Sequence, residues 1–477
     1  MGNHNKLLQF LRPVDTAGVA ADDDEDPPSM APSPMSSSAS PYVMSPWVNL
    51  PGIGGDGFVS GAGNVAGDKT GLIGSLVKEN GHIYSLAAAG DLLYTGTDSK
   101  NVRVWKDRRE FAGFKSGSGL VKAIVVAGDG RIYTGHQDGK IRVWRSSETA
   151  DGAAAVPRRV GSLPRLAHVL RAAVRPAGYI DTGRRRNSTV WIRHFDAVSC
   201  LSLDAGAGIL YSASWDRSFK AWRVSDSRCL DSVAAAHDDA VNTVAAAGFD
   251  ALVFTGSADG AVKVWRREVV GPRGATRHAM ERVLRRGDGA VTAVAVAAEA
   301  RVVYVASSDG AVTHWQFRRR HGAVGGGALP PPRNGGVMRG HKTAAVLCLA
   351  VAGRVVASGS ADRTICVWRR EEGAEHVRLA VLAAHTGPVK CVAVDEENGD
   401  GDGDGGGERR WVVYSGSLDG SVKVWRVSST PDATAQTPAR MTPAAASAWK
   451  RTPPSPLAAW TPYAAARRRD GECRAVV

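Results

Sequence analysis

The chain has 477 residues, of which 43% are hydrophobic and 22% are charged, with 55 glycines and 23 prolines. This length suits two or three ordinary domains or one large repeat array, and the composition excludes a wholly disordered chain. No apolar run is long enough to cross a membrane, the N-terminus lacks the pattern of a secretion signal, and the six cysteines form no CxxC pair. We therefore expect an intracellular protein, in the cytoplasm, the nucleus or both, without a disulfide framework or a zinc site.

The formal net charge of +13 is unevenly distributed along the chain. Residues 1–68 are acidic, with a run at Asp22–Asp26 followed by a Pro/Ser-rich stretch, and residues 428–477 are rich in Ala, Pro and Arg. Both segments have too few apolar side chains to offset the entropy lost on ordering, so we expect two disordered tails. Residues 69–427 then form the folded domain, whose basic surface suits nucleic acid, acidic proteins or anionic lipid.

The folded domain repeats one phrase seven times. Each copy is a short β-branched or aromatic run, a turn with Asp-Gly or a related pair, and an apolar/polar alternation ending in Trp, as in Leu252–Trp265. A second apolar run precedes each phrase, for example Val241–Ala246. Each unit thus supplies at least three strands, and seven units arranged radially can bury faces that one unit cannot. The phrases end at Trp105, Trp144, Trp222, Trp265, Trp315, Trp368 and Trp425.

These phrases resemble WD repeats, and the resemblance, which covers about Thr70 to Arg426, implies an all-β fold: a seven-bladed β-propeller of four-stranded blades. Spacings of 39 and 43 residues between Trp residues in the compact repeats agree with the period of that family. None of the seven terminal Trp residues is followed by Asp, the pair that names the family. Ring closure requires a strand from the other end of the domain. We therefore expect Gly71–Leu76 to be the outer strand of the seventh blade, which also removes a sheet edge.

The resemblance also implies a buried hydrogen-bond set in each blade that joins His, Ser or Thr, Asp and Trp. Such a set satisfies an indole N–H and a carboxylate that are costly to bury unpaired. Repeats three, four, six and seven are complete, whereas repeats one, two and five lack at least one member. Four copies around a ring favour a structural role over catalytic dyads. The complete sets are His194, Ser212, Asp216, Trp222; His237, Thr255, Asp259, Trp265; His341, Ser358, Asp362, Trp368; and His385, Ser415, Asp419, Trp425.

The segment Arg145–Arg193 is a long insertion with ten arginines and three acidic residues. Within it, Ser162–Val174 has apolar residues at helical spacing. This pattern predicts a helix that either packs on the propeller rim or docks an acidic partner. Ser188 follows three arginines and fits either a basophilic kinase site or a solvated loop. Candidate phosphosites before Pro in the C-terminal tail are Thr437, Thr442, Thr452 and Ser455.

In proteins of this family the turns before each Trp lie on one face of the ring, where partners often dock. Repeat three places Trp215 just before the turn Asp and Arg217 just after it, and Trp and Arg are common anchors of protein interfaces. Trp215 either anchors a partner or only covers a neighbouring blade. His136 and Arg363 lie at related turn positions and join this candidate partner-binding surface.

The sequence shows no phosphate-binding glycine loop, no nucleophile elbow and no cluster of metal ligands, so we expect no enzyme activity, no cofactor and no metal. The acidic stretch Asp395–Glu408 resembles the start of a calcium loop. However, Trp411 stands where a bidentate Glu is required, so we expect a flexible acidic hairpin loop there.

Four stretches resemble plant WD-repeat proteins of the JINGUBANG group, which is named for a regulator of pollen germination: Ser45–Pro51, Gly71–Ala88, Thr97–Trp105 and Val190–Leu203. This resemblance implies an interaction scaffold in plant signalling or developmental control. We expect a monomeric propeller that binds other proteins, acidic or transcription-regulatory, and neither a membrane nor nucleic acid directly. Two alternatives stay open. One is a substrate receptor of a cullin ubiquitin ligase, for which Trp105–Arg108 is a shifted match, and the other is a basic nucleic-acid-associated propeller.

Overall fold

The computed structural model describes most of the predicted folded domain. The described residues are 70–76, 81–117, 120–146, 156–174, 179–181, 188–270, 275–319, 330–341, 344–372, 375–397 and 409–429. The tail predicted at residues 1–68 and all but the first two residues of the tail predicted at 428–477 lie outside this set. Ser428 is the last residue of strand β30. No helix in the described ranges is long and apolar enough to cross a membrane.

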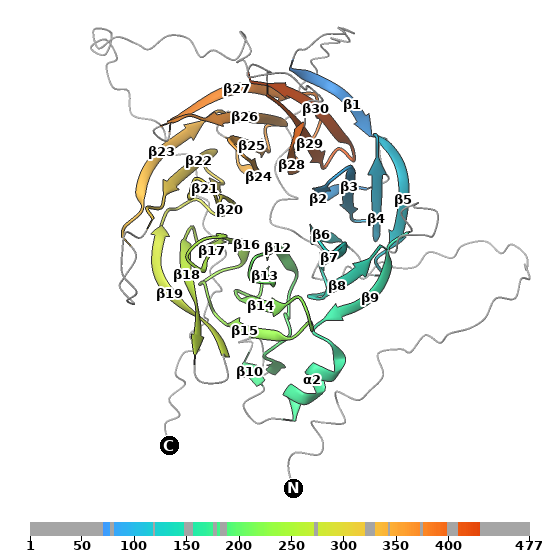
Figure 1. Ribbon diagram of the computed structural model, residues 1–477, viewed down its shortest axis with the longest axis vertical. Helices are drawn as coiled ribbons and strands as arrows, with labels where there is room; N and C mark the ends of the chain where they lie inside the picture. The colour runs from blue at the N-terminus through green and yellow to red at the C-terminus, as the bar shows by residue number, and fades with distance from the viewer. Residues whose placement is uncertain are drawn as a thin grey trace, which may run out of the picture. The chain divides into compact units, whose positions relative to one another are not determined.

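Seven antiparallel sheets of four strands each surround a common centre and form a seven-bladed propeller (Figure 1). Blade 1 comprises β2 (Ile83–Ala89), β3 (Leu92–Thr97), β4 (Asn101–Lys106) and β5 (Arg109–Lys115). Blade 2 comprises β6 (Val121–Val126), β7 (Arg131–His136), β8 (Ile141–Arg145) and β9 (Arg158–Leu163). Blade 3 comprises β12 (Val198–Asp204), β13 (Ile209–Ser214), β14 (Phe219–Arg223) and β15 (Cys229–Val233).

The remaining four blades follow the same order from the innermost strand outward. Blade 4 comprises β16 (Val241–Ala246), β17 (Leu252–Ser257), β18 (Val262–Val270) and β19 (Ala275–Arg285). Blade 5 comprises β20 (Val291–Ala297), β21 (Val302–Ser307), β22 (Ala311–Gln316) and β23 (Arg333–Arg339). Blade 6 comprises β24 (Val346–Ala352), β25 (Val355–Ser360), β26 (Thr364–Arg370) and β27 (His376–Ala383). Blade 7 comprises β28 (Val389–Glu397), β29 (Arg410–Ser417), β30 (Val422–Ser428) and β1 (Gly71–Leu76).

The seventh blade is closed by the N-terminal strand, as the sequence predicts. Strand β1 pairs antiparallel with β30, with Gly71 opposite Arg426 and Leu76 opposite Val422. The Thr70 hydroxyl lies 3.1 Å from the Ser428 hydroxyl, although 358 positions separate the two residues in the chain. In Figure 1 the blue strand β1 lies along the outside of the red strand β30. The first and last strands of the described domain are therefore hydrogen-bonded to each other.

The turn between the second and third strands of every blade contains one residue with a positive φ. Glycine occupies this position in four blades, and it is required where the turn touches a neighbouring segment. A Cβ on Gly260, for example, would lie 1.8 Å from the Gly287 carbonyl oxygen. The other three blades place a cation there. The seven residues are Lys100, Gly139, Arg217, Gly260, Gly310, Arg363 and Gly420.

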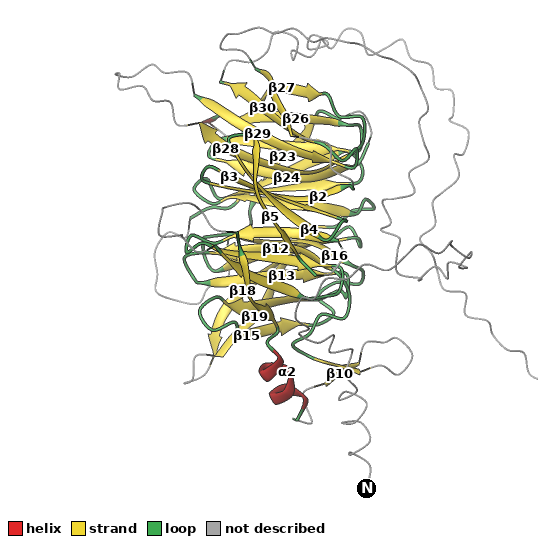
Figure 2. Cartoon of the chain, turned by 90° about the vertical axis from the view of Figure 1, so that its right-hand side faces the viewer, coloured by secondary structure: helices red, strands yellow, loops and turns green. Residues whose placement is uncertain are grey.

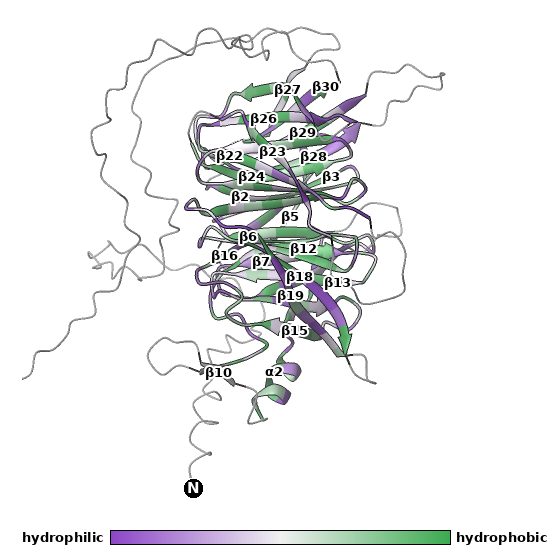
Figure 3. Ribbon diagram, turned by 90° about the vertical axis from the view of Figure 1, so that its left-hand side faces the viewer, coloured by the Kyte–Doolittle hydropathy of each residue, from purple (hydrophilic) through white to green (hydrophobic). Residues whose placement is uncertain are grey.

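The hydrophobic core lies between blades. One cluster joins Phe114 of blade 1 to Ile132 and Trp144 of blade 2, and another joins Leu76 and Val424 of blade 7 to blade 1. The side view in Figure 2 shows that the strands of the blades run from one face of the ring toward the other. In Figure 3 the innermost strands β2, β6 and β24 are largely hydrophobic, whereas much of β18 is hydrophilic. Each blade thus packs one face against the blade before it and the other face against the blade after it.

The described part of the Arg-rich insertion contains one helix, which lies inside the predicted stretch Ser162–Val174. Helix α2 spans Leu166–Ala173. Ser162 and Leu163, at the start of the stretch that contains the helical spacing, belong to β9 because they pair with β8. A two-stranded sheet of β10 (Tyr179–Asp181) and β11 (Ser188–Val190) follows.

Only part of the predicted apolar face of this helix packs on the propeller. Val169 and Ala173 contact the core shared by blades 2 and 3. Leu166 and Leu170 remain 73% and 51% exposed. The helix therefore packs on the rim, as one of the two predicted alternatives states, and it leaves two leucines in solvent.

The pairing of β1 leads to a prediction for ring stability. Replacing Leu76, which is 3% exposed, by Ala should lower the free energy of unfolding by about 2–5 kcal/mol, because it opens a cavity between blades 7 and 1. The matched control is Leu72→Ala on the same strand, where the side chain is 46% exposed and a loss of about 0.5 kcal/mol or less is expected. Urea unfolding followed by Trp fluorescence measures both, and equal losses would contradict a closing role for β1.

Candidate functional site

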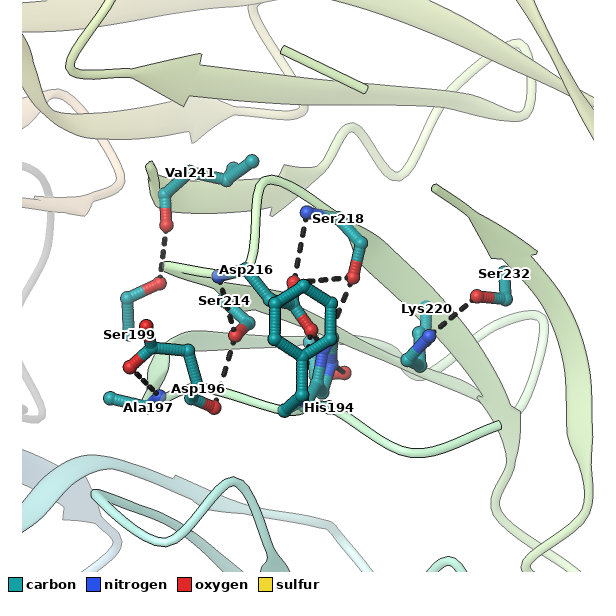
Figure 4. A network of polar contacts seen from close by, with 12 residues as sticks. His194, Asp196, Ala197, Ser199, Ser214, Asp216, Ser218, Lys220, Ser232 and Val241 are labelled. Atoms are coloured by element: carbon teal, nitrogen blue, oxygen red, sulfur yellow. Dashed lines mark hydrogen bonds and ion pairs between the residues drawn. The ribbon is translucent and has the colours of Figure 1, made fainter. Parts of the chain in front are cut away.

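Four blades contain the complete hydrogen-bond set. In blade 3, the Trp222 indole N–H donates to the Ser212 hydroxyl at 2.9 Å. The Ser212 hydroxyl lies 2.8 Å from His194 Nε2, and His194 Nδ1 lies 2.8 Å from the Asp216 carboxylate. These contacts are consistent with Ser212 donating to Nε2 of a neutral imidazole, whose Nδ1–H donates to an ionised Asp216. Figure 4 shows His194, Asp216 and Ser218 at the centre of this network.

The same set recurs in blades 4, 6 and 7. The His Nδ1 to Asp distances are 3.0 Å for His237–Asp259, 3.1 Å for His341–Asp362 and 2.9 Å for His385–Asp419. The His Nε2 atoms lie 2.7, 2.9 and 2.8 Å from the hydroxyls of Thr255, Ser358 and Ser415, which accept from Trp265, Trp368 and Trp425. Donors and acceptors are consumed within each set, so none of these histidines is left to activate a substrate.

The environment of each set shifts the pKa of its members. Burial opposes ionisation of Asp259, but hydrogen bonds from His237 and from backbone N–H groups outweigh it and lower the pKa of Asp259 to about 2. Burial lowers the pKa of His194, which keeps it neutral beside Asp216. Around His341, burial favours the neutral form, yet the contacts with Asp362 and Cys366 raise the pKa of His341 to about 9. The histidines of blades 3 and 6 therefore share a geometry but not a protonation behaviour.

Blade 2 replaces the missing upstream histidine with His136, which was predicted to join the partner-binding surface. That prediction is wrong, because His136 is fully buried. Its Nε2 lies 2.7 Å from the Thr134 hydroxyl, which accepts from Trp144. Burial, together with the charge of Arg142, lowers the pKa of His136 to about 3. The side chain thus takes a structural role inside the blade.

Blade 5 substitutes an arginine for the absent histidine. Arg285, the last residue of β19, donates to the Ser307 hydroxyl at 3.1 Å and to the Gly289 carbonyl at 3.1 Å. It also lies 3.4 Å from the Asp309 carboxylate. Sequence reasoning missed Arg285 because it does not occupy the position of the histidine in the repeat.

The structure separates the members of the candidate partner-binding surface. Trp215 and Arg217 lie in the β13–β14 turn of blade 3, whereas Arg363 lies in the equivalent turn of blade 6, three blades away. All three are on the face of the ring that carries these turns. Trp215 is partly buried, and its backbone N–H donates to the Ala197 carbonyl at 3.1 Å. The two arginines are exposed.

A residue that the sequence analysis did not select lies against Trp215. The Lys122 ammonium, from the innermost strand of blade 2, is 4.2 Å from the centroid of the Trp215 ring and 5.6 Å from that of Tyr84. These are cation–π distances. The signal available in the sequence was a lysine inside an otherwise apolar innermost strand.

The opposite end of blades 3 and 4 contains a cavity of about 480 Å³, lined in part by Arg131, Arg223 and Arg267. Each of these arginines is paired with a carboxylate, of Asp129, Asp226 and Asp204 respectively. Because its positive charges are balanced, this cavity is less suited to an anionic partner than the face that carries Trp215.

One of the predicted phosphosites, Ser188, lies among the described residues. Ser188 is the first residue of β11, where it pairs with Asp181. Thr437, Thr442, Thr452 and Ser455 lie outside the described residues. Among the described residues, no group of three or more His, Cys, Asp or Glu could hold a metal ion, and the cysteines at 200, 229, 348, 366 and 391 are free thiols.

The hydrogen-bond sets lead to a pH-dependent prediction. Asp259→Asn should cost about 3 kcal/mol at pH 7, because a buried charge-assisted contact with His237 is lost. Since the folded pKa of Asp259 is about 2, below the usual value of about 3.9 for an Asp carboxyl, this difference is fully present above pH 4 and disappears as the pH falls through 2.

The control for this measurement is Asp309→Asn in blade 5. The Asp309 side chain is 48% exposed and has no histidine partner, so a loss of about 1 kcal/mol or less is expected. Denaturant unfolding of both variants and the parent between pH 2 and 7 gives the comparison. A cost for Asp259→Asn that does not change with pH would contradict the assignment of an ionised carboxylate.

Comparison with known proteins identifies the repeat. The family model "WD domain, G-beta repeat" (WD40) matches residues 73–106, 186–223, 228–266, 333–369 and 377–426. Each matched segment spans the outermost strand of one blade or the inserted strand before it, and the three inner strands of the next.

Two relatives match a short part of the chain. Striatin-4 from Homo sapiens is 33% identical over 87 residues, which is 18% of this chain and 11% of that protein. Striatin-4 from Mus musculus is 29% identical over 90 residues, which is 18% of this chain and 12% of that protein. The chain thus spans about a tenth of the length of these relatives. The matched segments and the sheet topology together show that the chain carries WD40 repeats folded into a seven-bladed β-propeller.

Proposed function

We propose that this protein is a non-enzymatic interaction scaffold whose partner docks on the face of the propeller that carries the β13–β14 turn. The observation that carries the proposal is Trp215, a partly exposed indole at the tip of that turn with the Lys122 ammonium 4.2 Å from its centroid. Aromatic side chains and arginines dominate the binding energy of protein interfaces. Propellers with WD40 repeats generally bind other proteins, which agrees with this assignment.

The backbone of the neighbouring turns supports the same face. Arg217 and Arg363 have φ angles of 68° and 72°, a region that favours glycine. A non-glycine residue there costs about 1 kcal/mol or more. Neither guanidinium makes a hydrogen bond or ion pair to another described residue, so no internal contact accounts for the arginines. Retaining two strained, exposed cations suits a surface that contacts an acidic partner.

The finer assignment rests on the resemblance to the plant proteins of the JINGUBANG group. We infer a role in plant signalling or developmental control of the kind that governs pollen germination, in the cytoplasm or the nucleus. The propeller acts as a monomer and binds acidic or transcription-regulatory proteins. The net charge of +13 supports an acidic partner. The alternative of a cullin substrate receptor gains no support from the fold, because Arg108 of the shifted motif donates to the Ile73 carbonyl of the closing strand.

The test uses a variant in which folding is not at risk. Arg217 and Arg363 both have a left-handed backbone conformation, which glycine adopts without strain. Replacing both by Gly should therefore give a variant at least as stable as the parent. Affinity purification from the source tissue followed by mass spectrometry should show one stoichiometric partner with the parent chain. That partner should be reduced at least tenfold with the double variant or with Trp215→Ala.

The control is Val269→Ala, at the opposite end of blade 4, where the side chain is 74% exposed. It should retain the partner. If the partner survives all substitutions on the Trp215 face, the assignment of that face is wrong. The absence of any specific partner with the parent chain would contradict the scaffold itself.

A further inference from the structure

The innermost strands of all seven blades share one irregularity. In each, the pairing with the second strand shifts after the first residue, so one residue lies outside the regular ladder; in β6 this is Lys122, between Val121 and Ala123. Such bulges redirect a side chain away from the regular alternation of a sheet. The seven bulge residues are Tyr84, Lys122, Ser199, Asn242, Thr292, Leu347 and Lys390.

Three consecutive bulge residues bind the next blade. The Ser199 hydroxyl donates to the Val241 carbonyl at 2.5 Å, the Asn242 amide donates to the Val291 carbonyl at 2.8 Å, and the Thr292 hydroxyl donates to the Val346 carbonyl at 2.5 Å. Leu347, which follows in blade 6, is buried. From blade 3 to blade 6, the bulge positions are therefore satisfied by the ring itself.

The other three bulge residues form a different arc. Lys390 of blade 7, Tyr84 of blade 1 and Lys122 of blade 2 are consecutive around the ring, and Trp215 of blade 3 continues the arc beyond Lys122. All four residues lie toward the face that carries the β13–β14 turn, because the first residues of each innermost strand pair with the end of the second strand. The arc thus consists of two ammonium groups and two aromatic rings.

The described residues supply no ion-pair partner for either ammonium. The Asp196 carboxylate interacts electrostatically with Lys122 but forms no ion pair with it. Asp196 instead accepts a hydrogen bond from the Ala197 N–H. Asp98, on the side of Tyr84, accepts from the His82 N–H. Lys390 faces the thiols of Cys348 and Cys391, which burial keeps neutral by raising their pKa values.

Two cations in this position are costly in the unbound protein. Burial and the charge of Lys390 lower the pKa of Lys122 to about 7, and burial lowers the pKa of Lys390 as well. Each ammonium has three donors and is compensated best by oxygen anions. Nothing in the fold requires lysine here, since Ser, Asn and Thr at the equivalent positions bridge the blades.

We propose that Lys390, Tyr84, Lys122 and Trp215 form a binding site for a glutamate or aspartate side chain of an acidic partner segment. The ammonium groups donate to the carboxylate oxygens, and the aromatic rings flank the apolar stem. This inference rests on the proposed docking face and names the chemistry that the face recognises. The net charge of +13 gives the complementary long-range attraction.

Binding of a defined probe tests the proposal. The probe is hexaglutamate labelled with fluorescein, with hexaglutamine as the uncharged comparison, and fluorescence anisotropy with the full chain gives the affinity. Lys122→Gln and Lys390→Gln should each weaken hexaglutamate binding about tenfold or more, the effect expected for one charge-assisted hydrogen bond. Lys122→Met keeps an apolar side chain against Trp215 but removes the charge, so it should weaken hexaglutamate binding as much as Lys122→Gln does. Lys122→Arg should retain most of the affinity.

The matched control is Lys106→Gln. It removes the same charge at the far end of blade 1, where Lys106 pairs with Asp91. Its affinity should change less than twofold. If Lys106→Gln and Lys122→Gln weaken binding equally, the peptide senses only overall charge and the proposal is overturned. Equal binding of hexaglutamine would also overturn it.

A second readout needs no variant. Acetylation of the parent chain with an N-hydroxysuccinimide ester at pH 7, mapped by mass spectrometry, should modify Lys122 readily, and hexaglutamate should protect it at least fivefold while leaving Lys106 unprotected. A lack of protection at Lys122 at saturating peptide would overturn the proposal. Capture of the tissue partner by Lys122→Gln at parental level, with loss from Trp215→Ala, would retain the docking face and reject the carboxylate site alone.

The chain's own acidic run, Asp22–Asp26, is the rival occupant. Replacing these residues with Asn and Gln should raise the affinity for hexaglutamate no more than twofold if the site serves a partner. If hexaglutamate binds only after this replacement, the site belongs to the chain's own segment, and the proposal of a partner ligand is overturned.

Discussion

The fold depends on one constraint: a four-stranded sheet has two apolar faces and cannot cover either by itself. Every blade therefore requires a neighbour on both sides, and a row of blades is stable only when it closes into a ring. Here the closing contact is the pairing of β1 with β30, which places Leu76 in the core between blades 7 and 1. The buried Trp–Ser–His–Asp sets are a second consequence, because each satisfies polar groups that close packing between blades removes from water.

The fold was predictable because its signals are local and repeated. Alternation of period two, the turn residues and the terminal Trp define three strands in each repeat, and their number implies the ring. The closing strand, Gly71–Leu76, was predictable because the seventh repeat requires a fourth strand from the other end of the domain. In the insertion, Ser162 and Leu163 precede the residues with helical spacing, but pairing with β8 makes them part of β9.

The candidate site was less predictable, because it depends on contacts between repeats. His136 was placed on the surface from its turn position, yet Thr134 and the packing of blade 2 bury it. Arg285 replaces a histidine from a position outside the repeat alignment. Lys122 becomes notable only when Trp215 of the next blade is seen beside it. The sequence repeat predicts the strands within one blade, whereas the binding face consists of residues from several blades.

The closure of the ring also sets an order of events during synthesis. Thr70 and Ser428 are 358 positions apart, so β1 leaves the ribosome long before β30 exists. At about 5–20 residues per second, roughly 20 to 70 seconds separate the two strands. During that time the first blades must remain folded without the seventh, and the glycines at both ends of the GLIG segment give β1 little apolar surface to bury elsewhere. β30, the last strand of the described residues, therefore supplies the partner that β1 lacks until then.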